Sequence, residues 1–283
     1  MGKRKKKKQK PKKREGGRTG PTLAQQADRY DLYQRSVQEA EVEAEFFDRV
    51  YRSLHGRAPT ILREDFCGTF AVCCEWVKGE GRTAVGVDLD PEPLAWGREH
   101  NLSRLDPAAQ ERVSLVEGDV RTVSEPKADV LAAQNFSYWI FKTRDELRAY
   151  LEIARQNLAE GGIMVLDLFG GSECYVENDP DVRKYKGFRY RWEMDEFDPI
   201  SHDVRHYIHF DFKDGSHLEK AFVYEWRFWT LPEVREVLAE AGFAKTTVYW
   251  EGEDEDGEGN DEYEAVERAT CDPSWIAYIV AER

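Results

Sequence analysis

Two apolar runs that each end in a carboxylate constrain the fold of this 283-residue chain more than any other feature. The first run covers Ile61 to Asp65 and leads into a small-residue turn at residues 66–69, and the second covers Ala84 to Asp88. Asp88 lies 23 positions after Asp65 (88 − 65). That separation is close to the roughly 20-residue spacing that places a carboxylate on the ribose in dinucleotide-binding βαβ units. The pattern predicts two parallel strands whose carboxyl ends form a nucleoside site.

Further apolar runs alternate with helical patterns, which is typical of a parallel sheet covered on both faces. One helix start is marked by Asp90, a candidate N-cap, and by Pro91 at the first helical position. If Asp90 caps the helix, Asp88 is left to face a ligand. The expected strands are residues 60–64, 83–88, 113–116, 128–133 and 163–169, and the expected helices are one or two within 28–54, then 70–78, one from Pro91, 144–159 and 231–241.

After residue 170 the spacing of apolar residues changes to a period of two. Residues 204–212 and 218–228 alternate apolar and polar side chains on either side of the turn at residues 213–215. This pattern predicts an antiparallel hairpin, and residues 188–194 are expected to add a third strand.

The chain then ends in an expected strand pair around a strongly acidic segment. The two strands are residues 246–250 and 275–280, and the segment from Glu251 to Glu264 holds nine acidic residues among Gly and Asn. We expect this segment to be a solvated loop.

The net charge of −14 conceals a basic amino-terminal segment. Residues 1–20 carry eleven Lys and Arg against the single acid Glu15, so the remainder carries about −24 (−14 − 10). Residues 3–8 are all Lys or Arg and cannot bury apolar area, so residues 1–21 are expected to be a disordered tail. Such a tail would suit a nucleic-acid or other acidic partner, or simply remain solvated.

Cysteine usage and hydropathy limit the cellular compartments in which we expect the protein. Five cysteines, with Cys73 and Cys74 adjacent, do not indicate a disulfide framework, and no Cys/His spacing indicates zinc. We therefore expect no metal. No stretch approaches about 18 apolar residues, and the basic amino terminus lacks the apolar core of a signal peptide. The expected location is cytoplasmic, or nuclear in a eukaryotic cell.

These residues together resemble the class I S-adenosylmethionine-dependent methyltransferases over roughly residues 28–283. The resemblance implies an α/β fold with a seven-stranded Rossmann-like sheet and an antiparallel β-hairpin excursion after the fifth strand. It predicts a methyltransferase domain over residues 22–283 in which residues 170–229 form a substrate-lid insertion. A dehydrogenase would need a second mononucleotide-binding half and a closer match to GxGxxG, and the sequence shows neither.

The resemblance implies S-adenosylmethionine as the cofactor. The acidic, glycine-containing first motif corresponds to residues 64–69, although only Gly68 remains of the family's glycines and Phe70 stands in place of the last. Asp88 corresponds to the acid that accepts hydrogen bonds from both ribose hydroxyls, a task for an acceptor-only group, and Asp119 to the acid that accepts from the adenine amino group. The expected cofactor-binding residues are Asp65, Cys67, Gly68, Thr69, Asp88, Leu89, Asp119, Val120, Gln134, Asn135 and Tyr33. Arg29, Arg35 and Arg63 are alternatives for the cofactor carboxylate.

The expected catalytic residues are His206, Tyr138 and Asn135. A histidine in the hairpin is a candidate general base, with a structural role as its alternative. Asn135 follows the fourth strand, where it would bind the methionine part of the cofactor or the acceptor, or else cap the strand. Tyr33 is expected over the cofactor, with a place in the core as its alternative.

The leading functional hypothesis is methyl transfer to nitrogen or oxygen of a small molecule. One alternative is an RNA or basic-protein methyltransferase that uses the basic amino-terminal arm as a tether. A second alternative is a cofactor-binding module without catalysis, which the single-glycine first motif favours. The sequence does not identify the methyl acceptor, the oligomeric state, or the partner of the tail.

Overall fold

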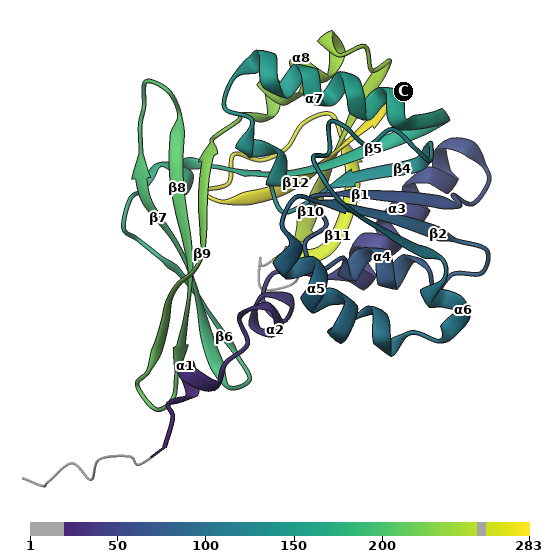
Figure 1. The fold of residues 1–283 in the computed structure, drawn as a ribbon. Coiled ribbons are helices and arrows are strands. Elements are labelled where there is room, and N and C mark those ends of the chain that lie inside the picture. Colours follow the sequence, from purple (N-terminus) through teal and green to yellow (C-terminus); the bar gives the residue numbers. More distant parts are fainter. Residues whose placement is uncertain (1–19, 254–258) are drawn as a thin grey trace, which may run out of the picture.

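The computed structural model describes residues 20–253 and 259–283, which form two β-sheets that stand side by side (Figure 1). The larger one, called the main sheet below, has eight strands in the order β11-β10-β12-β5-β4-β1-β2-β3. Its strands are β1 (Ile61–Asp65), β2 (Thr83–Asp88), β3 (Val113–Glu117), β4 (Ala128–Ala133), β5 (Leu158–Gly170), β10 (Lys245–Glu253), β11 (Gly259–Val266) and β12 (Trp275–Glu282).

The first five strands of the main sheet are mutually parallel, and β12, β10 and β11 extend it in antiparallel pairs. This arrangement confirms the predicted α/β architecture with a Rossmann-like sheet. Parallel strands that follow one another in βαβ units carry their carboxyl ends at the same edge. The loops after β1, β2, β3 and β4 therefore meet there.

The strand number is not the expected seven, because part of the acidic segment pairs with β10 as strand β11. Tyr263 is buried there, with its ring 5.9 Å from that of Phe46 and 4.5 Å from that of Tyr278. Burial of this aromatic ring anchors a strand that charge alone would leave in solvent. The expectation of a solvated loop is therefore wrong for residues 251–253, which belong to β10, and for residues 259–264, while residues 254–258 lie outside the described residues.

Helices cover both faces of the main sheet. Helices α3 (Ala40–His55), α4 (Ala71–Trp76), α5 (Pro91–His100) and α6 (Pro107–Gln110) lie on one face, and α7 (Arg144–Asn157) and α8 (Leu231–Glu240) lie on the other. Phe47 and Val50 of α3 share a buried cluster with Leu62 and Val165 of the sheet. The amphipathic face of α3 and the continuous apolar strands thus explain each other. In the part of the chain that the structure describes, no helix combines the length and apolarity needed to cross a bilayer.

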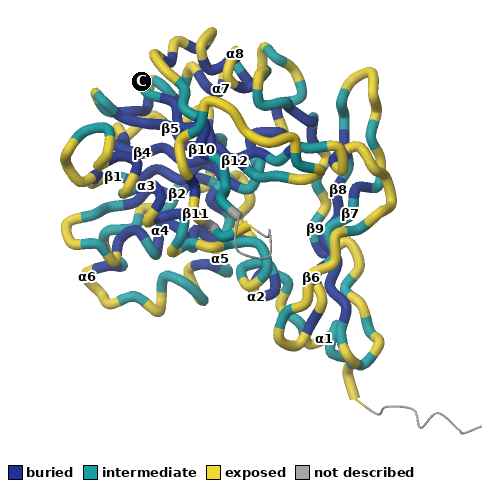
Figure 2. Tube along the Cα trace, turned by 180° about the vertical axis from the view of Figure 1, so that it is seen from behind, coloured by how far each residue is buried: buried dark blue, intermediate teal, exposed yellow. Residues whose placement is uncertain are grey.

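The smaller sheet, called the lid sheet below, is fully antiparallel, with the order β6-β7-β8-β9. Its strands are β6 (Asp181–Tyr185), β7 (Phe188–Phe197), β8 (Asp203–Phe212) and β9 (His217–Arg227). The predicted hairpin and its third strand are confirmed, and β6 is an additional strand. The lid sheet stands beside the main sheet at the carboxyl-terminal edge of the parallel strands (Figures 1 and 2). The short helix η2 (Ser137–Ile140), which follows β4, contacts β9 there.

The amino-terminal segment joins the two sheets. Helix α1 (Leu23–Gln26) binds the lid sheet, where the backbone N–H of Leu23 donates to Asp214 at 3.0 Å. Helix α2 (Arg29–Gln34) then leads to the main sheet, where Gln34 donates to Thr69 at 2.8 Å. The predicted tail, apart from its last two residues, lies outside the described residues.

Candidate active site

Backbone strain gathers in the loops that follow β1 and β4. Phe66 and Phe70 adopt φ values of 59° and 46°, and Asn135 and Phe136 adopt 55° and 58°. Non-glycine residues occupy this left-handed region infrequently, and such residues cluster at active sites and ligand clamps. The carboxyl-terminal edge of the main sheet therefore carries two loops that the surrounding structure holds in a costly shape.

The loop after β1 is open above its single glycine. A Cβ atom added to Gly68, whose φ is 50°, would meet nothing within 4 Å. Phe70 adopts a left-handed conformation at the position of the family's last glycine, and its ring packs against α5 at Gly97. A Cβ atom at Gly97 would lie 2.5 Å from that ring. The glycine that allows close packing here is therefore Gly97 of α5, and not a residue at the end of the loop.

Of the other expected residues in this loop, Cys67 and Thr69 are buried. Burial raises the pKa of the Cys67 thiol well above its usual range, and the thiol packs towards Gly86 of β2. Thr69 Oγ1 receives the hydrogen bond from Gln34. A ligand at this loop would therefore meet backbone at these two positions.

Asp88 connects the loop after β1 to the loop after β2. One carboxylate oxygen accepts from the backbone N–H of Gly68 at 2.7 Å, and the other accepts from Asp90 N–H at 2.9 Å. Burial raises the pKa of this carboxyl group. Asp90 caps α5 by accepting from Glu92 N–H, as predicted. The neighbouring Leu89 is 72% exposed, so an apolar side chain lies open beside a carboxylate that retains unused lone pairs.

Asp65 is enclosed by protein partners. Its buried carboxylate accepts from Arg63 Nε at 2.7 Å and from the hydroxyl of Tyr150 at 3.0 Å. Arg63 is held in turn by the carbonyl of Val120 at 2.8 Å, and the Val120 side chain is buried. Successive side chains of a strand point to opposite faces, so Glu64 is the acid on the face where α3 and α4 pack. Asp65 and Val120 are thus enclosed by protein partners, whereas Glu64 lies on the opposite face of β1.

Asp119, at the end of β3, is already paired. Arg121 donates to both of its oxygens, at 3.0 and 2.6 Å, and these bonds lower the pKa of the carboxyl group. Asp119 is partly exposed at the edge of the site. An adenine amino group would have to share this carboxylate with Arg121.

The loop after β4 is held by Asp167 of β5. The Asp167 carboxylate accepts from the backbone N–H groups of Asn135 at 2.7 Å and Phe136 at 2.9 Å, and burial raises its pKa to about 7. Gln134 donates to the carbonyl of Val165, while its buried Oε1 has no partner among the described residues. Tyr138 is buried and its hydroxyl donates to the carbonyl of Asp167 at 2.9 Å. The geometry gives Tyr138 a structural contact and does not support a catalytic role.

His206 lies on the face of the lid sheet that is turned towards this loop. It is 2% exposed and stacks on Trp192 at a centroid distance of 4.5 Å, with Phe169 of β5 at 5.7 Å and Trp226 at 6.0 Å. Neither ring nitrogen has a hydrogen-bond partner among the described residues, and burial lowers the pKa of the imidazole to about 3. A neutral imidazole with an unused donor and an unused acceptor thus lies inside an aromatic cage.

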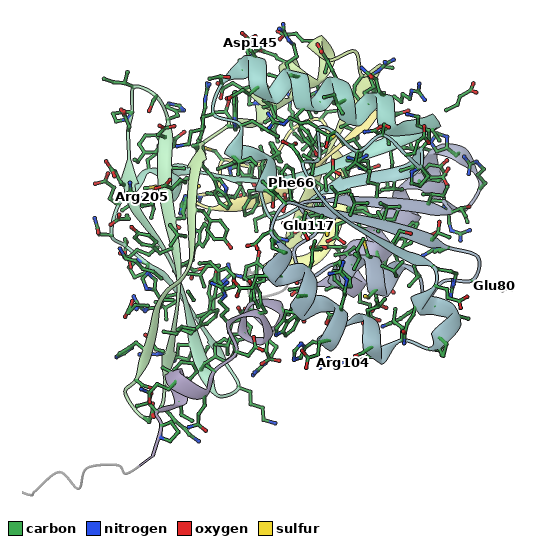
Figure 3. All side chains as sticks on the ribbon, viewed as in Figure 1. Phe66, Glu80, Arg104, Glu117, Asp145 and Arg205 are labelled. Carbon is green, nitrogen blue, oxygen red and sulfur yellow. The ribbon has the colours of Figure 1, made fainter. Side chains whose placement is uncertain are left out.

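Tyr33 lies where α2 meets the lid sheet. Its ring is 4.8 Å from that of Phe222, and its hydroxyl is hydrogen bonded to Tyr224. Arg29 pairs with Glu92, and Arg35 pairs with Asp31. Because Arg63 is also engaged, each of the three suggested arginines already has partners away from the loops after β1 and β4. Figure 3 places Phe66 and Glu117 on the side of the main sheet that faces the lid sheet.

Sequence reasoning missed several residues that the structure brings to this edge. Glu64 could have been found from the alternation of β1, and Asp167 from its position as the one charged residue in an apolar run. Glu43 lies on the apolar face of α3, three and four positions before Phe46 and Phe47. No local signal marks Trp192 or Tyr224 as neighbours of the site, because their contacts depend on how the two sheets meet.

Comparison with known proteins shows what this fold resembles. No protein-family model matches the chain, and no curated protein matches it in sequence. Several solved structures do match it in shape. CalS10, an amino pentose methyltransferase from Micromonospora echinaspora solved with S-adenosylmethionine bound, is 20% identical, with a TM-score of 0.63 over 90% of this chain and 95% of that one.

Two further solved structures are similar to this chain over most of its length. DesVI from Streptomyces venezuelae is 21% identical, with a TM-score of 0.63 over 89% of this chain and 95% of that one. KedS8, a sugar N-methyltransferase from a Streptoalloteichus species, is 18% identical, with a TM-score of 0.60 over 94% of this chain and 96% of that one. These similarities confirm the fold that the sequence resemblance implied: a Rossmann-like methyltransferase sheet with an added antiparallel sheet.

Proposed function

We propose that this protein is an S-adenosylmethionine-dependent methyltransferase that methylates a nitrogen or oxygen atom of a small molecule. One observation carries the proposal. The strained loop after β4 lies between the two sheets, with Phe136 4.7 Å from Phe169 of β5 and 6.2 Å from Trp226 of β9, and His206 without a hydrogen-bond partner among the described residues lies beside these rings. Strain and unpaired buried polar groups at one place are typical of a site that binds a ligand.

The residues present fit the cofactor. The open space above Gly68, the exposed Leu89 and the carboxylate of Asp88 offer a backbone approach, an apolar contact for a base and an acceptor for ribose hydroxyls. Asp119 would share its carboxylate between Arg121 and the adenine amino group. Tyr33, Gln134 and Asn135 would lie at the methionine part. When bound, the cofactor supplies an electrophilic methyl group on a sulfonium.

The remaining work belongs to the protein. The aromatic cage of Trp192, Trp226 and Phe169 would exclude water and align the acceptor, which accounts for much of the rate gain in such displacements. His206 stays neutral in the cage, so one ring nitrogen can accept a hydrogen bond from the acceptor's N–H or O–H group. It would take that proton only as methyl transfer makes the acceptor strongly acidic. Asn135 would orient the acceptor through its side-chain amide. The proposed catalytic set is therefore His206 with Asn135.

The test is methyl transfer from the labelled cofactor into fractionated cell extract. We expect calorimetry to detect cofactor binding and label to enter the small-molecule fraction, and more slowly with a His206 variant. Label confined to RNA or protein would favour the arm-tethered alternative, and salt sensitivity that disappears on removal of residues 1–20 would support it. Binding without turnover would favour a non-catalytic module. Failure to bind the cofactor at millimolar concentration would overturn the proposal.

A further inference from the structure

One buried carboxyl group near the loop after β1 has no role in the site described so far. Glu43 lies in the first turn of α3 and is 6% exposed. Its Oε2 atom has no hydrogen-bond partner among the described residues. A buried polar atom without a partner destabilises the folded protein, so a ligand that pairs with Glu43 would relieve this cost.

The groups that surround Glu43 are acids and phenols from several elements. Glu64 of β1, Asp167 of β5 and Glu39, which precedes α3, all act on its charge. Burial raises the pKa of Tyr33 of α2 and of Tyr278 of β12, and the charges of Glu43 and Asp167 raise both further. Among the described residues, no Lys, Arg or His hydrogen bonds or ion pairs with Glu43, Glu64 or Asp167.

The strand register explains why these acids share one face. Glu64 lies opposite Ala132 of β4, and Ala132 lies opposite Val165 of β5. Asp167 is two residues beyond Val165, so alternation returns it to the same side. Burial raises the pKa of Glu64 and of Asp167 to about 7, and that of Glu43 well above its usual range.

Three buried carboxyl groups without a cation tend to keep protons, because desolvation and mutual repulsion both disfavour the charged form. A cation that enters among them reverses this preference. Gln134 Oε1, also buried and without a partner among the described residues, follows β4 between these strands and can accept from the same cation. The cluster formed by Glu43, Glu64, Asp167 and Gln134 therefore fits an ammonium group, which presents three donors.

We propose that Glu43 binds the α-ammonium group of the cofactor and releases its proton to solvent as the ligand enters. This inference rests on the proposed function. The ammonium keeps its own protons, and the carboxylic acid of Glu43 becomes a carboxylate. The cofactor, rather than the methyl acceptor, is the favoured ligand because α3 packs on the face of the main sheet that carries Glu64 just before the loop after β1, whereas His206 belongs to strand β8 of the lid sheet.

The test counts protons in a binding experiment and needs no turnover. Calorimetry in two buffers of different ionisation enthalpy, at pH 6 and pH 8, gives the number of protons released per ligand. The three ligands are S-adenosylmethionine, S-adenosylhomocysteine, which keeps the ammonium but lacks the sulfonium charge, and 5′-methylthioadenosine, which lacks both. The variants are Glu43→Gln and, as the matched control, Glu45→Gln on the exposed side of the same helix.

We expect the wild-type protein to release more protons at pH 6 with either of the first two ligands than with the third, because Glu64 and Asp167 can lose protons together with Glu43. Glu43→Gln should lower that release by close to one proton and weaken the first two ligands roughly 10- to 100-fold, while 5′-methylthioadenosine and Glu45→Gln stay unchanged. Glutamine resembles a protonated glutamate in shape, so the variant should fold. If it does not, the wild-type difference between S-adenosylhomocysteine and 5′-methylthioadenosine still decides.

Two outcomes would overturn the inference. Equal proton release with all three ligands would remove the ammonium from the explanation, and unchanged release in Glu43→Gln would remove Glu43. Both differ from failure of the proposed function itself, in which the wild-type protein would bind none of the three adenosyl compounds.

Discussion

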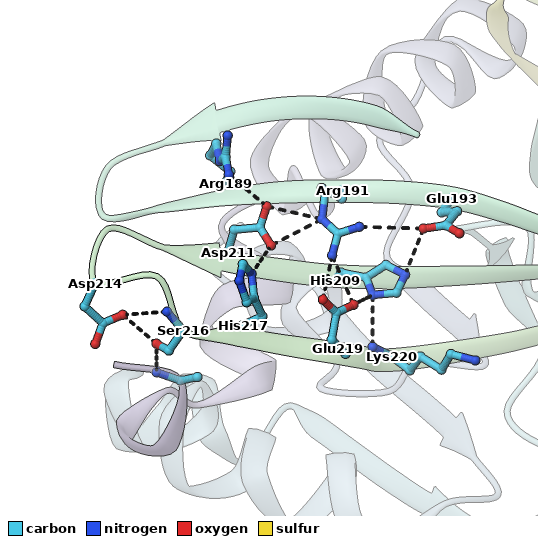
Figure 4. Close-up of polar contacts among 11 residues, drawn as sticks. Arg189, Arg191, Glu193, His209, Asp211, Asp214, Ser216, His217, Glu219 and Lys220 are labelled. Atoms are coloured by element: carbon cyan, nitrogen blue, oxygen red, sulfur yellow. Dashed lines mark hydrogen bonds and ion pairs between the residues drawn. The ribbon is translucent and has the colours of Figure 1, made fainter. Parts of the chain in front are cut away.

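Two histidines on strand β8, three residues apart, occupy opposite faces of the lid sheet and differ in almost every contact. His209, on the outer face, contacts the carboxylate of Glu219 through Nδ1, which also receives the backbone N–H of Lys220 at 3.2 Å (Figure 4). Its Nε2 lies 3.4 Å from Glu193. His206, on the inner face, has rings around it and no hydrogen-bond partner among the described residues.

The polar groups of the outer face mostly pair with one another, although the buried Nε2 atom of His209 lies 3.4 Å from Glu193 without a hydrogen bond. Arg191 reaches Asp211 at 3.2 Å, Glu219 at 2.9 Å and Glu193 at 3.6 Å, so a guanidinium group lies among the acids (Figure 4). Asp211, His217 and Glu219 each offer an atom that could hold a metal ion, and these three atoms lie within 4.8 Å of one another. Asp211 and Glu219, however, already pair with Arg191. Folded proteins satisfy nearly all their buried polar groups. At His206 on the inner face, both buried ring nitrogens lack a hydrogen-bond partner among the described residues. The inner face is therefore the better candidate for binding a ligand.

The largest expected effect is on turnover. Replacement of His206 by Leu should lower the rate of methyl transfer about 10²- to 10⁴-fold, the usual contribution of a general base. Cofactor affinity should change less than about twofold, because the cage lies away from Asp88. Steady-state kinetics with the identified acceptor and calorimetry with the cofactor give the two numbers. A large loss of cofactor affinity would place His206 in the cofactor site instead.

Asp88 tests the opposite wall of the site. Asp88→Ala should weaken cofactor binding by about 1.5–3 kcal/mol for each charge-assisted hydrogen bond lost, with retention of the fold checked by circular dichroism. The control is Glu92→Ala on the exposed first turn of α5. Unchanged affinity in Asp88→Ala would remove this residue from the site.

The two faces should also differ in how pH acts on stability. The pKa of His206 is about 3 in the folded protein, below the usual value near 6.5, so the unfolded chain binds more protons between these values. Its contribution to stability therefore rises with pH across this window and is lost as pH falls, by at most about 1.4 kcal/mol per pH unit. Urea unfolding of the wild type and His206→Leu at pH 4, 5, 6 and 7 isolates the effect, because Asp167, Glu64 and Glu43 contribute to both proteins. If the free energy of unfolding changes with pH equally in the two proteins, His206 is hydrated or has a hydrogen-bond partner.

The smallest expected effect belongs to the outer face. His209→Leu should reduce the free energy of unfolding by about 1–2 kcal/mol, because it leaves the Lys220 N–H without a partner and removes one partner of Glu219, which keeps Arg191. Turnover should stay within about twofold of wild type when kinetics are measured below the unfolding transition. Loss of turnover without loss of stability would contradict the division between the two faces.

Much of the fold was predictable because its signals are local. Continuous apolar runs marked the parallel strands, Asp90 and Pro91 marked the start of α5, and the alternation around residues 213–215 marked the lid hairpin. The partners of Asp65 have a local cause as well, since one step along β1 exchanges the face where α3 and α4 pack for the face that packs on α7. Strand β11 was missed because Tyr263 is buried by rings from distant parts of the chain.

The site was predictable only in outline. Asp88 and the loop after β1 followed from spacing, but the partners that decide each role did not. The partners of Asp65 include Tyr150, which comes 85 residues later, and Asp167 holds a loop that precedes it by more than thirty residues. Sequence indicates which groups are available, whereas burial and pairing determine which of them stay free.

The binding of α1 to the hairpin turn has a mechanical consequence. Leu23 N–H and Ala24 N–H donate to Asp214 and Ser216 at the β8–β9 turn, and a few residues later Gln34 is fastened to Thr69 beside the loop after β1. A load applied to the chain ahead of Gly20 would thus reach the turn first and be transmitted to the loop through a single short helix. Residues 23–34 thus tie the β8–β9 turn to the loop after β1, so a shift of one would be felt by the other.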